Sequence, residues 1–153
     1  KEDGTVYYMA EALCNTVLGE GSYEVKESFV GKDLEYKEYE PLFDCAGEIC
    51  AKQRKKAYFV VCDTYVTLTD GTGVVHIAPA FGEDDSKVGR KYDLPFVQLV
   101  DAKGEMTKET PWPGTFCKKA DPLVLKIWTR EASYSPLRTL STAIRTAGDA
   151  ILR

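Results

Sequence analysis

The 153-residue sequence contains a single histidine, His76, and no Cys-x-x-Cys pair. A four-ligand zinc site needs several cysteine or histidine ligands, usually in closely spaced pairs, and this sequence has one histidine and no such cysteine pair. We therefore expect no bound metal. The cysteines are odd in number, and most stand beside apolar residues, which favours packing as small hydrophobic side chains over disulfide bonding. Such cysteine usage is typical of the reducing cytoplasm, which is the compartment we expect. The five cysteines are Cys14, Cys45, Cys50, Cys62 and Cys117.

The sequence also lacks long apolar runs and an excess of positive charge. No segment approaches the roughly 20 apolar residues that cross a bilayer, and no signal peptide is recognisable, so we expect no membrane partner. The net charge of −4 argues against electrostatic binding of nucleic acid by the domain as a whole. The basic run at 52–56 is a local exception, which we interpret as a solvated surface, with phosphate contact as the alternative. Because the chain opens at Lys1 without a methionine, we expect a fragment of a longer protein.

Several common catalytic signatures are missing. There is no Gly-x-Ser-x-Gly elbow, no phosphate-binding loop and no metal-binding helix motif. Gly71-Thr72-Gly73 resembles the start of a dinucleotide fingerprint, but the third glycine and the following helix are absent at the required spacing. A cysteine nucleophile would need His76 beside a thiol, and Cys62 is the nearest candidate in the sequence.

The length and composition fit one domain, with 44% hydrophobic and 29% charged residues. Helices are predicted over 11–18, over 83–92 and from Asp121-Pro122 onward, where Leu123, Ile127 and Trp128 would form a buried stripe. Residues 44–56 are predicted to be a loop. Because predicted strands outnumber helices, we expect a mixed α/β, β-rich fold with a bent or barrel-like β core and a few peripheral helices. The predicted strands cover 5–10, 23–29, 58–62, 65–69, 74–77 and 96–100, with a hairpin turn at 101–104.

The most informative stretch runs from Gly71 to Asp85 and carries the single histidine. A short strand is predicted before Pro79, and Gly82 then permits a turn into a helix whose first residues are acidic. This layout predicts that His76 and Asp85 converge on one small polar pocket. Taken alone, each residue also fits an ordinary structural role, His76 as a core or surface histidine and Asp85 as first-turn dipole compensation.

The whole stretch, GTGVVHIAPAFGEDD, closely resembles the signature of the editing domain inserted in isoleucyl-tRNA synthetases. The related leucyl and valyl editing domains typically continue with His-Asp where this chain has Phe81-Gly82, which favours the isoleucyl member. The resemblance covers most of residues 5–126, because further positions also fit the family: Lys91-Tyr92, Leu94-Pro95, Val100-Asp101, Gly104 and Ala120-Asp121.

This resemblance implies hydrolysis of the ester that joins a wrong amino acid, chiefly valine, to the terminal adenosine of isoleucine tRNA. It implies that Asp85 binds the α-ammonium group and that His76 lines the amino-acid pocket, which makes these two the catalytic candidates. Ala78, Phe81 and Gly82 match substrate-binding positions around the aminoacyl-adenosine. Editing would need no cofactor, with ATP used by the parent enzyme's synthetic domain. The implied partners are the tRNA 3′ end that carries the mischarged amino acid and the remainder of the synthetase chain.

Two departures from the family modify this expectation. The threonine-rich stretch that normally precedes a segment like Thr5–Leu13 is absent, and residues 127–147 do not follow the family pattern. We therefore expect residues 1–153 to form a single editing-domain fragment with a recognisable fold and weak or absent activity in isolation. The alternatives are a catalytically inactive fragment or binding module that retains the fold, and a leucyl or valyl editing domain.

Overall fold

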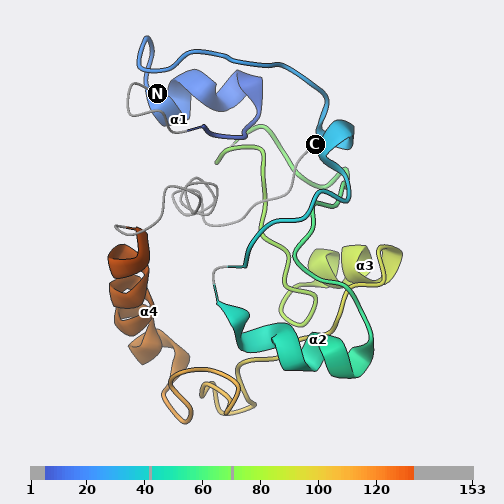
Figure 1. Ribbon diagram of the computed structural model, residues 1–153, viewed down its shortest axis with the longest axis vertical. Coiled ribbons are helices and arrows are strands. Elements are labelled where there is room, and N and C mark those ends of the chain that lie inside the picture. The colour runs from blue at the N-terminus through green and yellow to red at the C-terminus, as the bar shows by residue number, and fades with distance from the viewer. Residues whose placement is uncertain (1–5, 42, 70, 133–153) are drawn as a thin grey trace. The chain divides into compact units, whose positions relative to one another are not determined.

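The computed structural model describes residues 6–41, 43–69 and 71–132 (Figure 1). The chain divides into two compact units, and each is described by itself. The first unit contains residues 6–40 and 58–77, and the second contains residues 41–57 and 78–132. With η for a 3-10 helix, the helices are η1 (Glu11–Leu13), α1 (Cys14–Leu18), η2 (Gly31–Leu34), η3 (Asp44–Ala46), α2 (Gly47–Gln53), α3 (Glu83–Lys91) and α4 (Cys117–Ala132).

The predicted β-rich, barrel-like core is wrong. Among the described residues no strand or sheet forms, and extended segments pair only through isolated antiparallel bridges such as Glu38 with Phe59. Tyr36 and Tyr58 have left-handed backbone, with φ of 66° and 61°, and they limit this pairing to a few hydrogen bonds. β-branched and aromatic residues indicate that a segment suits a half-buried, extended backbone. A sheet also needs long neighbouring segments that pair with it in register.

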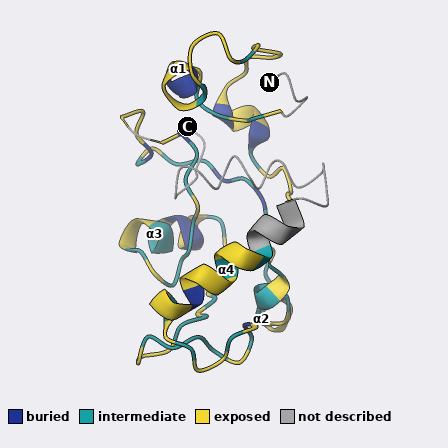
Figure 2. Ribbon diagram, turned by 90° about the vertical axis from the view of Figure 1, so that its left-hand side faces the viewer, coloured by how far each residue is buried: buried dark blue, intermediate teal, exposed yellow. Residues whose placement is uncertain are grey.

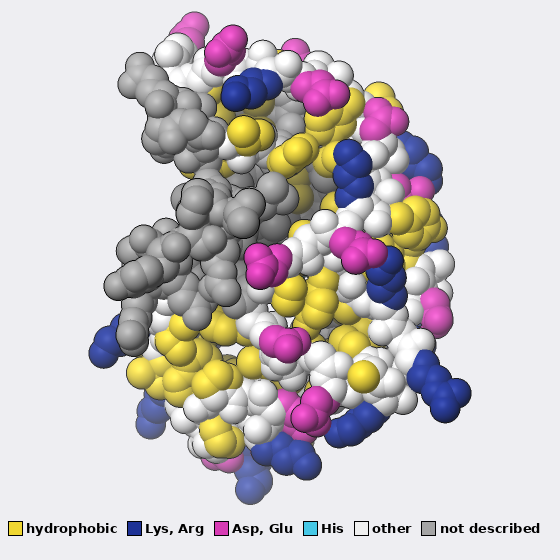
Figure 3. All heavy atoms as spheres, in the orientation of Figure 1, with side chains coloured by type: hydrophobic (Ala, Val, Ile, Leu, Met, Phe, Trp, Pro, Cys, Tyr) yellow, Lys and Arg dark blue, Asp and Glu magenta, His cyan; other side chains and the backbone are white. Residues whose placement is uncertain are grey.

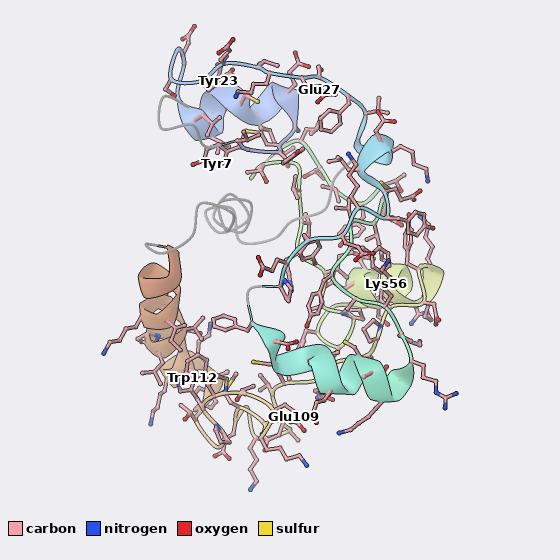
Figure 4. The ribbon with its side chains drawn as sticks, in the orientation of Figure 1. Tyr7, Tyr23, Glu27, Lys56, Glu109 and Trp112 are labelled. Carbon is pink, nitrogen blue, oxygen red and sulfur yellow. The ribbon has the colours of Figure 1, made fainter. Side chains whose placement is uncertain are left out.

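The first unit is built around η1 and α1. The predicted helix over 11–18 is confirmed as these two elements in succession, and Gly19 ends it with φ at 84°. Tyr23 lies beside α1, where its hydroxyl donates to Asn15 Oδ1 at 2.7 Å (Figure 4). The buried apolar residues of this unit are Leu13, Cys14, Leu34, Phe59, Val61 and Val66.

The start of the 71–85 stretch packs against the segment before η1. The Ala10 N–H donates to the Thr72 carbonyl oxygen at 2.7 Å, and Thr72 is only 3% exposed. Gly73 has φ at 73°, and a Cβ there would lie 2.5 Å from the Ala10 Cβ. Glycine is therefore required at this position for two reasons, its backbone conformation and the close approach of Ala10.

In the second unit, the prediction of a loop over 44–56 is wrong, because η3 and α2 occupy most of it. Helix α2 has only seven residues, too few to be stable in isolation, so tertiary contacts hold it. The Gln53 side chain supplies two of them, donating from Nε2 to the Phe96 carbonyl oxygen at 2.7 Å and accepting the Phe96 N–H at 2.9 Å. The ring of Phe43, just before η3, meets the Trp112 ring edge to face, with centroids 6.3 Å apart (Trp112 is labelled in Figure 4).

Helix α3 confirms the prediction of a helix over 83–92, since it spans Glu83–Lys91. Its first turn is acidic and its last turn carries Arg90 and Lys91, an arrangement that complements the helix dipole. Val88, which is 2% exposed, is buried toward the end of the helix, together with Gly89 (Figure 2).

Helix α4 begins at Cys117 rather than at Asp121, so Pro122 lies inside the helix and the predicted start is wrong. Its described surface is mostly exposed (Figure 2), with Ala120 at 1% exposed and Leu123 at 40%. The predicted stripe is therefore wrong at Leu123. Of the stretch 127–147, residues 127–132 continue α4 and the rest lies outside the described residues.

The predicted hairpin turn at 101–104 is confirmed. Asp101 Oδ1 accepts the N–H groups of Lys103 and Glu105 at 2.8 and 2.9 Å, and the Gly104 N–H donates to the Asp101 carbonyl oxygen at 3.0 Å. Gly104 supplies the positive φ, 78°, that this turn requires.

Gly73→Ala is expected to lower the free energy of unfolding by about 3 kcal/mol, because the methyl group adds overpacking to the strain of a positive φ. Ala10→Gly in the same chain should recover roughly half of this loss, since it removes the contacted Cβ. Gly21→Ala is the matched control, because Gly21 has φ at 74° and nothing within 4 Å of the added Cβ. Urea unfolding followed by circular dichroism measures all three, and equal losses at Gly73 and Gly21 would contradict the close contact.

Asp101 gives a pH-dependent prediction. The N–H groups of Glu105 and Lys103 hold the pKa of the Asp101 carboxyl below its usual range. Its stabilising effect is therefore present above the pKa of the unfolded chain and is lost as the pH falls through the lower, folded value. Asp101→Asn should be less stable than the parent at neutral pH, and the difference should shrink below about pH 4. Urea midpoints across this range test the effect, which a pH-independent difference would rule out.

Candidate functional site

The structure brings four of the five predicted site residues together in the second unit. Ala78, Phe81, Gly82 and Asp85 lie on the turn that leads into α3 and on its first turn. The Phe81 N–H donates to the Ala78 carbonyl oxygen at 2.9 Å, which closes the turn. Gly82 is the N-cap of α3, and its carbonyl oxygen accepts the Ser86 N–H at 2.9 Å.

Asp85 is the residue that ties this turn to the helix. Its side chain is half-buried, and Oδ2 accepts the Ala78 N–H at 3.1 Å. The carboxylate also lies at the helix N-terminus, where the aligned peptide dipoles favour negative charge. Asp85 therefore makes a specific contact across seven residues in addition to compensating the dipole.

The two acidic residues before Asp85 behave differently. Glu83 and Asp84 are exposed, and both pair with Lys87 at N–O distances of 3.1 and 3.0 Å. Hydrogen bonds from Lys87 to Asp84 and Glu83 raise the pKa of the lysine. These contacts are those of ordinary surface charges in the first turn of a helix.

One packing contact that supports the turn was not predicted from the sequence. A Cβ on Gly89 would lie 2.9 Å from the Pro79 Cβ, so α3 approaches the turn too closely for any side chain at that position. A glycine inside a helix costs about 1 kcal/mol relative to alanine, and its presence there is the sequence signal for such a close approach.

His76 and Phe81 are both exposed. His76 belongs to the first unit and lies outside any helix or strand, three residues after Gly73. Phe81, in the second unit, is 55% exposed, as is Phe96 in the same unit. The convergence of His76 and Asp85 on one pocket stays a prediction.

Three of the five cysteines, Cys14, Cys45 and Cys50, are not in the surroundings of activated nucleophiles. Burial raises the pKa of the Cys14, Cys45 and Cys50 thiols, with the charges of Glu11 and Asp44 adding to the effect. The Cys62 thiol, the candidate nearest His76 in the sequence, donates to the Gly31 carbonyl oxygen at 3.6 Å. A raised thiol pKa leaves less thiolate at neutral pH, and the thiolate is the reactive form.

Among residues 6–41, 43–69 and 71–132, no group of three or more histidine, cysteine or acidic side chains is placed to hold a metal ion. No helix within these ranges is long and apolar enough to cross a membrane. Acidic and basic side chains are interspersed over the face shown in Figure 3, so this face does not form a field of one sign.

Comparison with known proteins shows that the chain is similar to one segment of aminoacyl-tRNA ligases, although no protein-family model matches it. It is homologous to one segment of the isoleucine–tRNA ligases, which confirms the resemblance found in its sequence. The chain is 47% identical over 134 residues, 87% of its length, to the isoleucine–tRNA ligase of Clostridium novyi. It is 50% identical over 125 residues (81%) to that of Clostridium acetobutylicum and 33% identical over 125 residues (82%) to that of Picrophilus torridus. The chain spans about 12% of the length of these relatives.

Cys14, Cys45 and Cys50 are expected to react slowly with a disulfide reagent at pH 8, because little of each thiol is ionised in the folded protein. Unfolding in guanidinium should accelerate their reaction at least about tenfold, since it removes the burial that raises the pKa. Mass spectrometry of partially labelled protein assigns the rate of each cysteine. Equal rates for these three thiols in folded and unfolded protein would contradict the raised pKa values.

Proposed function

We propose that the chain is the editing segment of an isoleucine–tRNA ligase and hydrolyses the ester in isoleucine tRNA that carries valine. One observation carries the proposal: the stretch 71–85 has the editing signature and lies in a chain up to 50% identical to isoleucine–tRNA ligases. The names of these relatives also favour the isoleucyl member over a leucyl or valyl editing domain. The contact of Asp85 with the turn at 78–82 adds geometric support.

The need for such a reaction follows from the size of the two amino acids. A synthetic pocket that admits isoleucine discriminates only weakly against valine, which is one methylene smaller. A second site that is too small for isoleucine can remove valine after it has been attached. The same logic explains why the editing pocket must reject isoleucine by its walls, for which we propose His76, Ala78 and Phe81.

Asp85 supplies the charge that orients the substrate. Its carboxylate would pair with the α-ammonium group of the valyl ester, a charge-assisted contact that is strong in a partly enclosed site. Holding the ammonium group places the ester carbonyl for attack by water. The water oxygen bonds to the carbonyl carbon, the bond to the ribose oxygen breaks, and the ribose oxygen receives a proton, so valine and free tRNA leave. The neighbouring ribose hydroxyl would assist the water, and neither metal nor cofactor is needed.

The charge of the chain limits how it would meet tRNA. With a net charge of −4 and both signs interspersed on the face in Figure 3, it is poorly suited to gripping a phosphate backbone. We therefore propose that it receives only the mischarged 3′ end, while the rest of the ligase binds the body of the tRNA. ATP would be used elsewhere in that ligase, in the cytoplasm where tRNA is charged.

The test is made in the Clostridium acetobutylicum ligase with the 153-residue chain replacing the segment that it matches. This chimera should release valine from mischarged isoleucine tRNA, whereas the isolated chain should be weakly active or inactive. Asp85→Ala should lower the deacylation rate about a hundredfold or more, because the ammonium group loses its charged partner. Asp84→Ala is the matched control, since this neighbouring carboxylate pairs with Lys87.

Wild-type deacylation by the Asp85→Ala chimera would show that the role of Asp85 is wrong. A chimera that fails to release valine, while the native ligase does, would identify the chain as an inactive fragment or a binding module. Faster clearance of mischarged leucine or valine tRNA would favour the other editing families.

A further inference from the structure

We infer that Gly82 is a positioning residue, because the space left by its missing side chain lets the Asp85 carboxylate reach the Ala78 N–H. This contact fixes the turn that presents Ala78 and Phe81. The effect on deacylation rests on the proposed function, whereas the contact itself does not.

The geometry around Gly82 identifies one oxygen atom. A Cβ on residue 82 would lie 2.9 Å from Asp85 Oδ2 and 3.0 Å from Asp85 Cγ. Oδ2 is the same atom that accepts the Ala78 N–H at 3.1 Å. An alanine at position 82 would therefore compete for the space that this hydrogen bond needs.

The backbone of Gly82 does not itself require glycine. Its φ of −141° and ψ of 146° are extended values that any residue adopts. This separates Gly82 from Gly73, where positive φ and close contact act together. A substitution at position 82 tests the space beside Asp85 with little backbone strain.

Displacing Oδ2 would have two linked consequences. The half-buried Ala78 N–H would lose its acceptor, and the turn would lose its connection to α3. The carboxylate would also change direction, because the hydrogen bond to Oδ2 restrains the rotation of the whole group. The residue proposed to bind the ammonium group would then no longer be aimed as it is now.

The turn approaches α3 at a second point. Pro79, the residue after Ala78, lies so close to Gly89 that it cannot simply follow a displaced carboxylate. A shift at Asp85 would therefore strain the turn, and Phe81 at its exposed end would move with it.

The test measures the contact and the reaction separately. Amide hydrogen exchange of Ala78 in the 153-residue chain reports the hydrogen bond, and kcat and KM for valine release in the chimera report the reaction. We expect Gly82→Ala to accelerate Ala78 exchange and to lower kcat, each about tenfold or more, with a smaller change in KM.

Two further variants separate space from helix capping and charge. Serine is a better N-cap residue than alanine but has the same Cβ. If the space at position 82 is what matters, Gly82→Ser should accelerate Ala78 exchange and lower kcat as Gly82→Ala does. Asp85→Asn keeps an acceptor oxygen, so it should retain slow Ala78 exchange while losing deacylation. Recovery of both readouts by Gly82→Ser would overturn the inference in favour of a capping role.

The decisive comparison is a double-mutant cycle. In an Asp85→Ala background the displaced oxygen is absent, so Gly82→Ala should add no further change in exchange or in kcat. Gly47→Ala is the matched control, because a Cβ there would lie 2.5 Å from Asp44 Oδ1, a carboxylate outside the proposed site. It should leave Ala78 exchange and deacylation unchanged.

Additive effects of Gly82→Ala and Asp85→Ala, or equal effects of Gly82→Ala and Gly47→Ala, would overturn the inference. If the unsubstituted chimera releases no valine, the proposed function falls, and Ala78 exchange in Gly82→Ala still decides whether the contact exists. Unchanged exchange in that variant would overturn the contact as well.

Discussion

The hydrogen bond from the Ala78 N–H to the Asp85 carboxylate joins the turn at 78–82 to α3, and the arrangement of the candidate site depends on it. It is a direct contact between two residues that lie seven positions apart in the sequence. Pro79 against Gly89 adds apolar packing on the other side of the turn. A polar contact and a close backbone approach thus hold a short irregular segment that has no sheet to support it.

Close approach at glycine recurs along the whole stretch from Gly71 to Asp85. Gly73 meets Ala10 in the first unit, while Gly82 makes room for Asp85 in the second. In each case an atom of another residue occupies the space where a Cβ would lie. These glycines have a packing role, in addition to the flexibility that they give to turns.

The relationship to isoleucine–tRNA ligases gives these contacts a functional meaning. The chain matches about 12% of the length of its relatives, so the proposed reaction would also depend on residues outside it. Within that share, the carboxylate proposed to bind the substrate is also the group that holds the turn. In the proposed editing site, such a link would position the pocket walls and the ammonium ligand together.

The sequence by itself determined the features that depend on neighbouring residues. The helix predicted over 83–92 follows from the turn at Gly82 and the acidic residues after it, the turn at 101–104 follows from Asp101 and Gly104, and the family follows from the stretch 71–85. Only the tertiary structure decided the features that depend on distant partners. Residues suited to strands form no sheet among the described residues, since pairing between segments cannot be deduced from the composition of each one. Helix α2 forms where a loop was expected, because Gln53 binds the backbone of Phe96, 43 residues away. The contact of Gly82 with Asp85 could not be predicted either, because the sequence does not show which side chain occupies the space beside a glycine.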